Sequence, residues 1–285
     1  MQSGHFCSGF QVLSYFIGQL ATIDRQIRQI PRRMSSSSRV KNVTEKKAAG
    51  SRPVRSFVLR GGRLTEGQKR AMDEFWPRFG IDEDESLLVF KTLFGNDAPV
   101  IMEIGFGNGD AIWQMAQARP AENYVGVEVH RPGVGHLLLK MKQHGITNIR
   151  IANDDAVEFL RKRVPEESLA GVRIYFPDPW PKRRHQKRRL IQSSLIELLA
   201  FRMCPGAQLH LATDWEPYAE HMLQVMSLSD SFVNLSPSGD FCNRPQWRPQ
   251  TKYERRGERL GHQVRDLLFK RIPLPHGFNA ALTFS

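Results

Sequence analysis

A short apolar run followed by a segment with helical spacing recurs five times between residues 100 and 228. The apolar runs favour buried strands at residues 100–104, 124–129, 149–152, 172–176 and 209–212. The segments after them favour helices at residues 111–118, 133–144, 156–163, 187–203 and 217–228. Strands and helices that alternate at this spacing form a mostly parallel sheet with helices on both faces. Two further strands, at residues 232–235 and 267–272, complete a predicted α/β fold with a seven-stranded sheet.

One more helix is predicted ahead of this alternation. Thr65 can cap a helix that carries Met72, Phe75 and Trp76, and Pro77 is expected to end it. Residues 87–94 form a second short apolar segment before the first strand.

The formal charge of +12 is spread unevenly along the chain. Residues 1–60 hold 11 Lys or Arg against 2 Asp or Glu, whereas residues 61–285 hold 30 against 27. Basic residues of the folded part therefore support nucleic-acid binding only where they cluster. We predict that residues 1–54 form a basic, largely disordered extension and that residues 55–285 form the folded domain. Translation from Met34 is the alternative for the first 33 residues.

Cysteine usage and hydropathy exclude two classes of protein. Cys7, Cys204 and Cys242 are odd in number and far apart, which argues against a disulfide framework or a zinc site. No apolar run reaches the roughly 18 residues that a membrane-spanning helix needs. We expect a soluble, cytoplasmic protein that binds neither a membrane nor a metal.

The first predicted strand runs into a glycine-rich turn that contains Glu103, Gly105, Gly107 and Gly109. Glycines let the backbone turn tightly and let a ligand approach closely. The order G-x-G-x-G, with an acid two residues before it, differs from the G-x-G-x-x-G of dinucleotide enzymes. Because that acid would repel a pyrophosphate, the turn favours S-adenosylmethionine over NAD, although a glycine-rich turn alone can be a simple tight turn.

Acidic residues also lie at the ends of the second and third predicted strands. Glu128 could accept hydrogen bonds from both ribose hydroxyls, although taken alone it could be a solvated acid. Asp154 and Asp155 could accept the adenine amino group, and one of them could instead cap the helix that follows. The carboxyl ends of parallel strands meet at one edge of the sheet, where ligands bind. We therefore expect a cofactor site at this edge.

The loop after the fourth strand, residues 176–189, combines three kinds of chemistry. Its prolines forbid a helix at the start, so that Asp178 is held between Phe176 and Trp180. Six of the eight residues from 182 to 189 are Lys or Arg. A carboxylate, aromatic surface and phosphate-binding charge in one loop indicate chemistry on a base within nucleic acid. A solvated helix face is the simpler interpretation of the basic run.

These motifs together resemble the bacterial tRNA (guanine-N7)-methyltransferase family. The resemblance covers residues 55–273 and rests on FPDPW-x-K-x-RH-x-KRR, EIGFG-x-G, ATDWEPYAEHM and TKYERRG. The family often has His where this chain has Pro181. It implies a Rossmann-like class I methyltransferase fold and S-adenosylmethionine as cofactor. The implied substrate is the guanine at position 46 in the variable loop of tRNA.

The resemblance also implies residue roles. It assigns catalysis to Asp178 and cofactor contact to the glycine turn and four acids: Gly105, Gly107, Gly109, Glu103, Glu128, Asp155 and Asp178. The substrate-binding positions are Lys182, Asp214, Thr251, Lys252, Tyr253 and Glu254. The RNA-contacting positions are Arg184, His185, Gln186, Lys187, Arg188 and Arg189.

The chemistry of guanine N7 agrees with these residue types. N7 carries a lone pair and no proton, so most of the acceleration would come from alignment, up to roughly 7–11 kcal/mol. Asp178 could stabilise the cationic product, hold the donor edge of guanine or contact the methionine amino group. Asp214 and Glu254 are acceptors suited to the N1–H and amino group of guanine. Tyr253 or Trp180 could stack on the base.

Two other functions compete with this prediction. Asp178-Pro-Trp is similar to the loop of methyltransferases that act on amino groups of adenine or glutamine, but the adjacent second proline is missing. A non-catalytic RNA-binding protein on the same fold is the second alternative, and the intact glycine turn argues against it. We expect a monomer, with a homodimer as the alternative.

Overall fold

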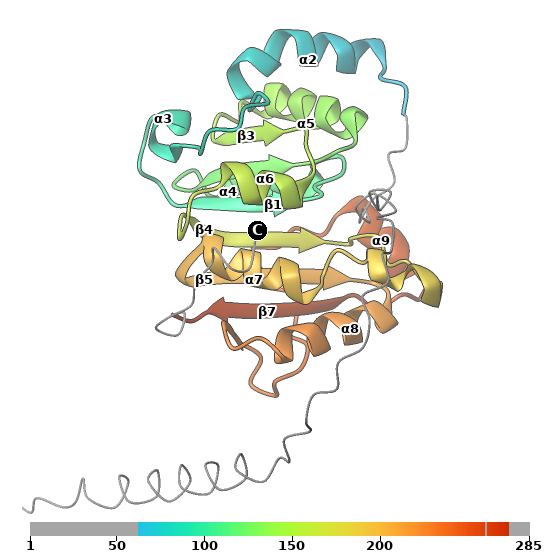
Figure 1. The fold of residues 1–285 in the computed structure, drawn as a ribbon. Coiled ribbons are helices and arrows are strands. Elements are labelled where there is room, and N and C mark those ends of the chain that lie inside the picture. Colours follow the sequence, from blue (N-terminus) through green and yellow to red (C-terminus); the bar gives the residue numbers. More distant parts are fainter. Residues whose placement is uncertain (1–61, 260, 274–285) are drawn as a thin grey trace, which may run out of the picture. The chain divides into compact units, whose positions relative to one another are not determined.

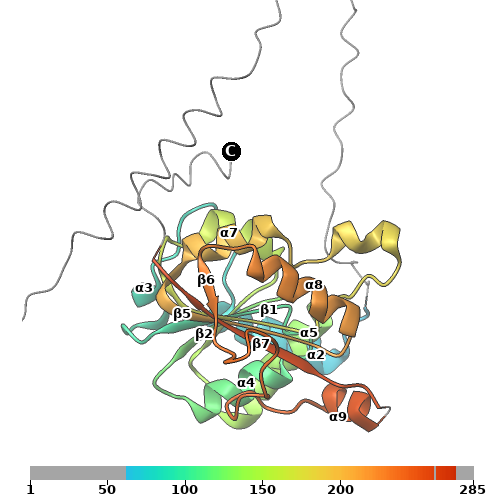
Figure 2. The ribbon, with the colours of Figure 1, turned by 90° about the horizontal axis from the view of Figure 1, so that it is seen from below.

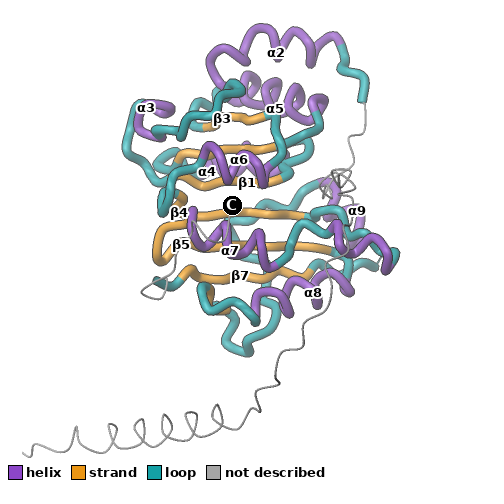
Figure 3. Tube along the Cα trace, viewed as in Figure 1, coloured by secondary structure: helices purple, strands orange, loops and turns teal. Residues whose placement is uncertain are grey.

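The computed structural model of the chain describes residues 62–259 and 261–273 (Figure 1). The extension predicted for residues 1–54, its boundary with the folded domain and the alternative start at Met34 lie outside these residues. The predicted alternation of strands and helices is confirmed (Figure 3).

The described residues form one seven-stranded sheet with the order β3-β2-β1-β4-β5-β7-β6. Its strands are β1 Val100–Ile104, β2 Asn123–Val127, β3 Ile149–Ala152, β4 Leu169–Tyr175, β5 Met203–Thr213, β6 Phe232–Asn234 and β7 Arg265–Arg271. The first five strands pair in parallel, whereas β7 is antiparallel to both β5 and β6. The strand order reverses between β1 and β4, and ligands in open α/β sheets bind outside the carboxyl ends of the strands at such a point.

Helices cover both faces of the sheet. They are α2 Glu66–Phe79, α3 Phe90–Phe94, α4 Asp110–Ala118, α5 Arg131–His144, α6 Ala156–Arg163, α7 Ser193–Arg202, α8 Glu216–Ser227 and α9 Lys252–Arg259, with a 3₁₀ helix, η1, at Arg183–Arg188. Helices α4 and α5 lie on one face and α7 and α8 on the other (Figure 2). Met102 of β1 packs in the core beneath α7 and α8, whereas its neighbour Ile101 packs in the core beneath α4 and α5. This alternation along a strand buried on both faces confirms the predicted Rossmann-like fold.

Helix α2 begins as predicted but ends later. The Thr65 hydroxyl accepts from the N–H of Gln68, and the Gln68 side chain accepts from the N–H of Thr65, which completes a capping box. Pro77 does not end the helix, which continues to Phe79. Pro77 cannot donate a helical hydrogen bond, but the helix continues past it because the backbone N–H of Gly80 donates to the carbonyl of Trp76.

The helix predicted at residues 187–203 is also different, because the basic run forms η1 and α7 begins only at Ser193. The segment between them is not helical, and Ile191 within it is buried. Its backbone N–H donates to the Tyr218 hydroxyl of α8 at 3.1 Å and is therefore not available to a helix. Tertiary contact with α8 thus replaces the local helical bond.

The direction of β7 brings a distant part of the chain to the ligand-binding edge. Arg265, the first residue of β7, pairs with Thr213 at the carboxyl end of β5. The segment that precedes β7, which includes α9, therefore arrives at this edge, and Figure 1 shows α9 on the side toward which the arrows of β4 and β5 point. Helix α9 was not predicted from the sequence. In the described part of the chain, no helix has the length and apolarity to cross a membrane.

Candidate active site

A cavity of about 380 Å³ lies at the carboxyl edge of the sheet. The glycine turn, the segments after β2 and β3 and the loop after β4 line it, with Gly105, Gly107, Glu128, Asp154, Asp155, Tyr175, Phe176, Pro177 and Asp178 among the lining residues. Four separate chain segments thus bring most of the predicted cofactor residues together. Gly109 and Glu103 are placed beside this cavity and do not line it.

The glycine turn has the backbone geometry that requires glycine. Gly105, Gly107 and Gly109 have φ angles of 69°, 57° and 79°, in the left-handed region. Glu128 holds the turn, because its Oε2 accepts from the N–H of Gly107 at 2.8 Å and its Oε1 accepts from the N–H of His130 at 2.8 Å. Each carboxylate oxygen keeps a further lone pair for a ligand hydroxyl.

Gly133, at the start of α5, fixes the other side of the turn. A Cβ atom at this position would lie 2.1 Å from the carbonyl oxygen of Gly107. No side chain fits there without moving the turn. Sequence reasoning missed this residue, although a glycine in the first turn of a predicted helix is the signal that could have found it.

Glu103 is a buried carboxyl group in which one oxygen has no hydrogen-bond partner among the described residues. It is 2% exposed, and no described group donates to its Oε2. Burial raises the pKa of Glu103 to about 8; nearby Arg173 opposes the shift and Glu128 adds to it. A cationic ligand group would supply the missing partner and favour the ionised form.

The structure shows one of the two roles that the sequence left open for Asp154 and Asp155, the helix cap. Asp155 caps α6, because its Oδ1 accepts from the N–H groups of Val157 at 2.9 Å and Glu158 at 3.4 Å. Asp154 accepts from the N–H of Asp155 at 2.6 Å and lines the cavity as well. Asp154 therefore has the freer carboxylate for a ligand.

The loop that carries Asp178 has a strained backbone at both ends. Phe176 has a φ angle of 50° and Trp180 one of 44°, which bulky residues rarely adopt. Such conformations persist where surrounding contacts hold them, and they concentrate at functional sites. Between these two residues, the exposed side chain of Asp178 lines the cavity.

Arg189 holds this loop from the protein interior. Its Nε donates to the carbonyl of Pro179 at 3.0 Å and its Nη1 to the carbonyl of Pro217 at 3.4 Å, and the residue is buried. It therefore differs from the rest of the predicted RNA-contacting run. Its place in the interior indicates a structural role.

The remaining basic run is open to solvent. Lys182, Arg183, Arg184 and Lys187 are exposed, whereas His185, Gln186 and Arg188 are partly buried. The guanidinium of Arg188 lies 4.1 Å from the centre of the Trp180 ring, a cation–π contact that supports the loop. Partial burial lowers the pKa of His185, and the neighbouring cations Arg184, Lys182 and Arg188 lower it further.

The predicted substrate-binding residues divide into open and enclosed ones. Asp214 follows β5, partly buried, with its Oδ2 3.5 Å from Nδ1 of His262. Thr251 accepts from the N–H of Glu254 at the start of α9. Glu254 is buried and accepts two hydrogen bonds from Arg248, both of 2.7 Å. Because Glu254 is paired with Arg248, Asp214 is the accessible acceptor of the two for a base edge. Lys252 and Tyr253 are the first two residues of α9.

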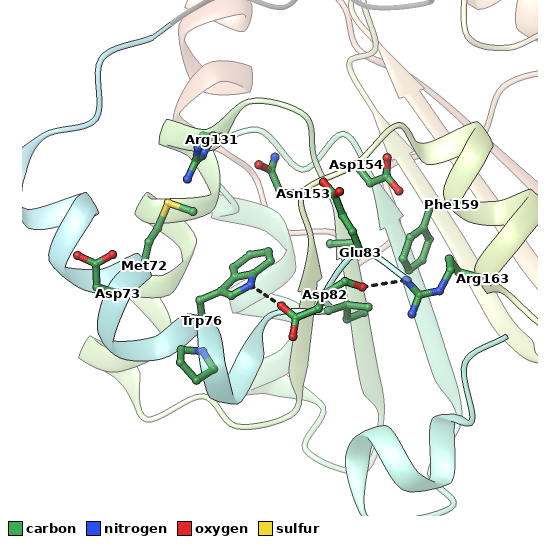
Figure 4. A pocket seen from close by; sticks show the side chains of 13 residues that line it. Met72, Asp73, Trp76, Asp82, Glu83, Arg131, Asn153, Asp154, Phe159 and Arg163 are labelled. Atoms are coloured by element: carbon green, nitrogen blue, oxygen red, sulfur yellow. Dashed lines mark hydrogen bonds between the residues drawn. The ribbon is translucent and has the colours of Figure 1, made fainter. Parts of the chain in front are cut away.

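A second, larger hollow of about 490 Å³ lies on the other side of Asp154, between α2 and α6 (Figure 4). Trp76 and Asp82 are joined there by a hydrogen bond from Nε1 to Oδ1 at 2.9 Å. Its charged lining residues are four acids and two arginines: Asp73, Asp82, Glu83, Asp154, Arg131 and Arg163. The hollow lacks both the glycine turn and the loop of Asp178, so the smaller cavity is the candidate active site. Among the described residues, no group of three metal-ligating side chains lies together.

The sequence comparisons with known proteins agree with one another. Residues 97–267 match a family model described as a putative methyltransferase. A tRNA (guanine-N(7)-)-methyltransferase of Alcanivorax borkumensis is 53% identical over 220 residues, which cover 77% of this chain and 92% of that protein. Its counterpart from Hydrogenovibrio crunogenus is 51% identical over 221 residues, which cover 78% and 92%. A solved 16S rRNA methyltransferase, KamB, aligns with a TM-score of 0.45 at 15% identity, covering 67% of this chain and 96% of that chain.

Proposed function

The chain belongs to the family of bacterial tRNA (guanine-N7)-methyltransferases, and from that membership we propose how its residues bind and align the two substrates. The enzyme transfers a methyl group from S-adenosylmethionine to N7 of a guanine in tRNA. We assign that guanine to the variable loop, as the motif resemblance implies. One observation carries the assignment of the site: a single cavity joins the glycine turn, the strand-end acids and Asp178.

The residues of the cavity fit S-adenosylmethionine, which supplies an electrophilic methyl group when it is bound. The glycine turn lets a ligand approach the backbone, and Glu128 retains lone pairs for the ribose hydroxyls. Asp154 is the acceptor that we assign to the adenine amino group. Glu103 lies beside the cavity, no described group donates to its Oε2, and we assign this acid to the methionine amino group. Its burial makes a charge-assisted bond there strong.

The guanine needs alignment more than it needs a base. N7 has no proton to lose, so the protein need not accept one during the transfer. The ring gains a positive charge, and we assign its stabilisation to the carboxylate of Asp178, which lines the cavity. Asp214 remains accessible for the donor edge of the base, which distinguishes guanine from adenine.

The exposed part of η1, together with Lys182 directly before it, is the surface that we propose for the tRNA backbone. Lys182, Arg184 and Lys187 present their charges to solvent directly after the loop of Asp178. Because Arg188 packs on Trp180, this surface and the loop are joined by a side-chain contact. Phosphates bound on η1 would therefore bring a neighbouring base toward Asp178.

We further propose that the enzyme acts in the cytoplasm as a monomer, with a homodimer as the alternative. A tRNA substrate supports the first assignment. Sedimentation analysis at micromolar concentration decides the second, since a homodimer would sediment at twice the mass of the chain.

The decisive experiment is methylation of unmodified tRNA transcripts followed by identification of the modified nucleoside. We expect 7-methylguanosine in the variable loop. Formation of 6-methyladenosine instead would assign the enzyme to amino-group methylation. Calorimetry that detects no S-adenosylmethionine binding would favour a non-catalytic RNA-binding protein.

The role of Asp178 is tested by comparing Asp178→Ala with the same substitution at another exposed acidic residue. We expect Asp178→Ala to lose methyl transfer while it retains tRNA binding, because the carboxylate acts on the developing charge. Asp230→Ala removes an exposed acid after α8 and should change neither property. Full activity of Asp178→Ala would remove this residue from the mechanism.

A further inference from the structure

Five buried polar side chains connect the cofactor cavity with α9. The Tyr175 hydroxyl, at the end of β4, is 3.0 Å from Nδ1 of His210, whose Nε2 is 2.7 Å from Oδ1 of Asp266. Arg248 donates to the other oxygen of Asp266 at 3.0 Å and to both oxygens of Glu254. All five residues are at most 9% exposed, and Tyr175 lines the cavity. The polar groups thus form one continuous series through the core.

The direction of each hydrogen bond in this series is fixed. The carboxylate of Asp266 can only accept, so His210 carries its proton on Nε2 and donates. Nδ1 of His210 is then an acceptor, and the Tyr175 hydroxyl donates to it. Burial lowers the pKa of His210 to about 4, while the hydrogen bond to Asp266 opposes this shift. The imidazole is therefore neutral near pH 7, and the series has one arrangement.

Arg248 is the residue at which three parts of the site meet. Glu254 belongs to α9, Asp266 belongs to β7, and both depend on the same guanidinium. The guanidinium carbon also lies 5.8 Å from the centre of the Tyr175 ring and 5.9 Å from that of Phe176. Arg248 thus contacts the strained first residue of the loop that carries Asp178.

The neighbouring residue, Trp247, adds to this anchorage. Its ring lies edge-on against His210, with centres 4.8 Å apart, and the guanidinium of Arg173 lies 4.3 Å from its centre. The segment before α9 is therefore held by both a ring contact and a cation–π contact. A segment held in this way can keep side chains on α9 in a fixed relation to β4.

We propose that Arg248 is a positioning residue for methyl transfer, which keeps the substrate-binding segment of α9 in register with the loop of Asp178 and the cofactor cavity. The proposal rests on the proposed function and on the substrate-binding role that the motif resemblance implies for residues 251–254 at the start of α9. Arg248 reaches neither substrate and acts through Glu254, Asp266 and Phe176. The planar guanidinium of an arginine can donate to two carboxylates at once, whereas the ammonium of a lysine does not have that geometry.

The test compares Arg248→Lys and Arg248→Gln with wild type in steady-state methylation of tRNA. A displacement of about 1 Å at a reacting centre can cost about 100-fold in rate, so we expect a fall in kcat of that order for Arg248→Gln. Arg248→Lys keeps the charge and should recover part of the loss. The affinity for S-adenosylmethionine, measured by calorimetry, should stay near the wild-type value, because Arg248 does not line the cavity.

Arg265→Gln is the matched control, since Arg265 lies on β7 next to Asp266 but pairs with Glu216 on the surface. Its kcat should stay at the wild-type value. A lower melting temperature with unchanged kcat in both Arg248 variants would overturn the proposal, because it would show a purely structural role. If Arg248→Gln does not fold, Arg248→Lys decides, and a wild-type kcat in that variant overturns the proposal equally.

Failure of the proposed function and failure of the positioning role of Arg248 give different experimental results. Wild-type enzyme that forms no 7-methylguanosine would refute the function, whatever the Arg248 variants do. Wild-type enzyme that forms it while Arg248→Gln retains its kcat would refute only the positioning role.

Discussion

Replacement of Glu103 by Gln should stabilise the protein without its cofactor and make its stability less dependent on pH. The folded-state pKa of Glu103 is about 8, against 4.5 for the free side chain. The folded chain therefore binds this proton more tightly than the unfolded chain does. The resulting contribution to stability is complete below pH 4.5 and is lost as the pH rises toward 8. A glutamine resembles the protonated carboxyl in shape and does not titrate.

The magnitude follows from the size of the shift. At about 1.4 kcal/mol per pH unit, the wild type loses about 3 kcal/mol of this stability between pH 4.5 and pH 7. Because Glu103 is only 2% exposed, solvent screening reduces this value little. For a domain of this size, 3 kcal/mol corresponds to a rise in melting temperature of about 6–12 °C. At pH 5 the two proteins should differ by less than about 1 kcal/mol.

The same variant should bind S-adenosylmethionine more weakly, because an amide offers no negative charge to the methionine amino group. Thermal unfolding at pH 5, 7 and 8.5 without cofactor measures the first effect. Calorimetry in two buffers of different ionisation enthalpy measures the second, since wild type should release a proton on binding at pH 7 and Glu103→Gln should not. Glu158→Gln, an exposed acid on α6, is the control. A constant difference in melting temperature between Glu103→Gln and wild type at all three pH values would refute the reasoning.

Three further predictions concern the edges of the site. Gly133→Ala should cost about 1–3 kcal/mol of stability and weaken S-adenosylmethionine binding, because its Cβ would meet the Gly107 carbonyl; normal affinity by calorimetry would contradict this. Asp155→Ala should cost about 1 kcal/mol in urea unfolding through the lost cap of α6, whereas an Asn at this position should retain most of the stability. Neutralising Arg184 and Lys187 should weaken tRNA binding and reduce its salt slope by roughly 0.7–0.9 for each phosphate that the protein no longer neutralises. An unchanged slope would mean that η1 is only a solvated face.

The parallel core and the positions of the cofactor-side acids could be predicted because they depend on local patterns. Apolar runs mark the buried strands, and the residue after each strand lies at the carboxyl edge by geometry alone. Glu128, Asp154 and Asp178 came together for this reason. The antiparallel direction of β7 has no such local signature.

The burial of Arg189 and Glu254 could not be predicted, because it depends on partners far along the chain. Arg189 binds a carbonyl 28 residues away, and the partner of Glu254, Arg248, is itself fixed by Asp266, 18 residues further on. In the sequence, both residues stand in hydrophilic runs that are typical of a solvated surface. Packing of the complete fold decides which charge of such a run turns inward.

The antiparallel strand β7 makes the proposed substrate side of this enzyme a separable module for engineering. The first five strands and the cofactor cavity are complete before the chain reaches β6, and the segment between β6 and β7 returns to the same edge with α9. Exchange of that segment between relatives could thus alter the choice of nucleic acid while the methyl-donor site stays intact. The exchanged segment would have to carry Arg248, and the receiving protein would have to offer Asp266 on β7 and His210 on β5, since these three residues join the module to the rest of the protein.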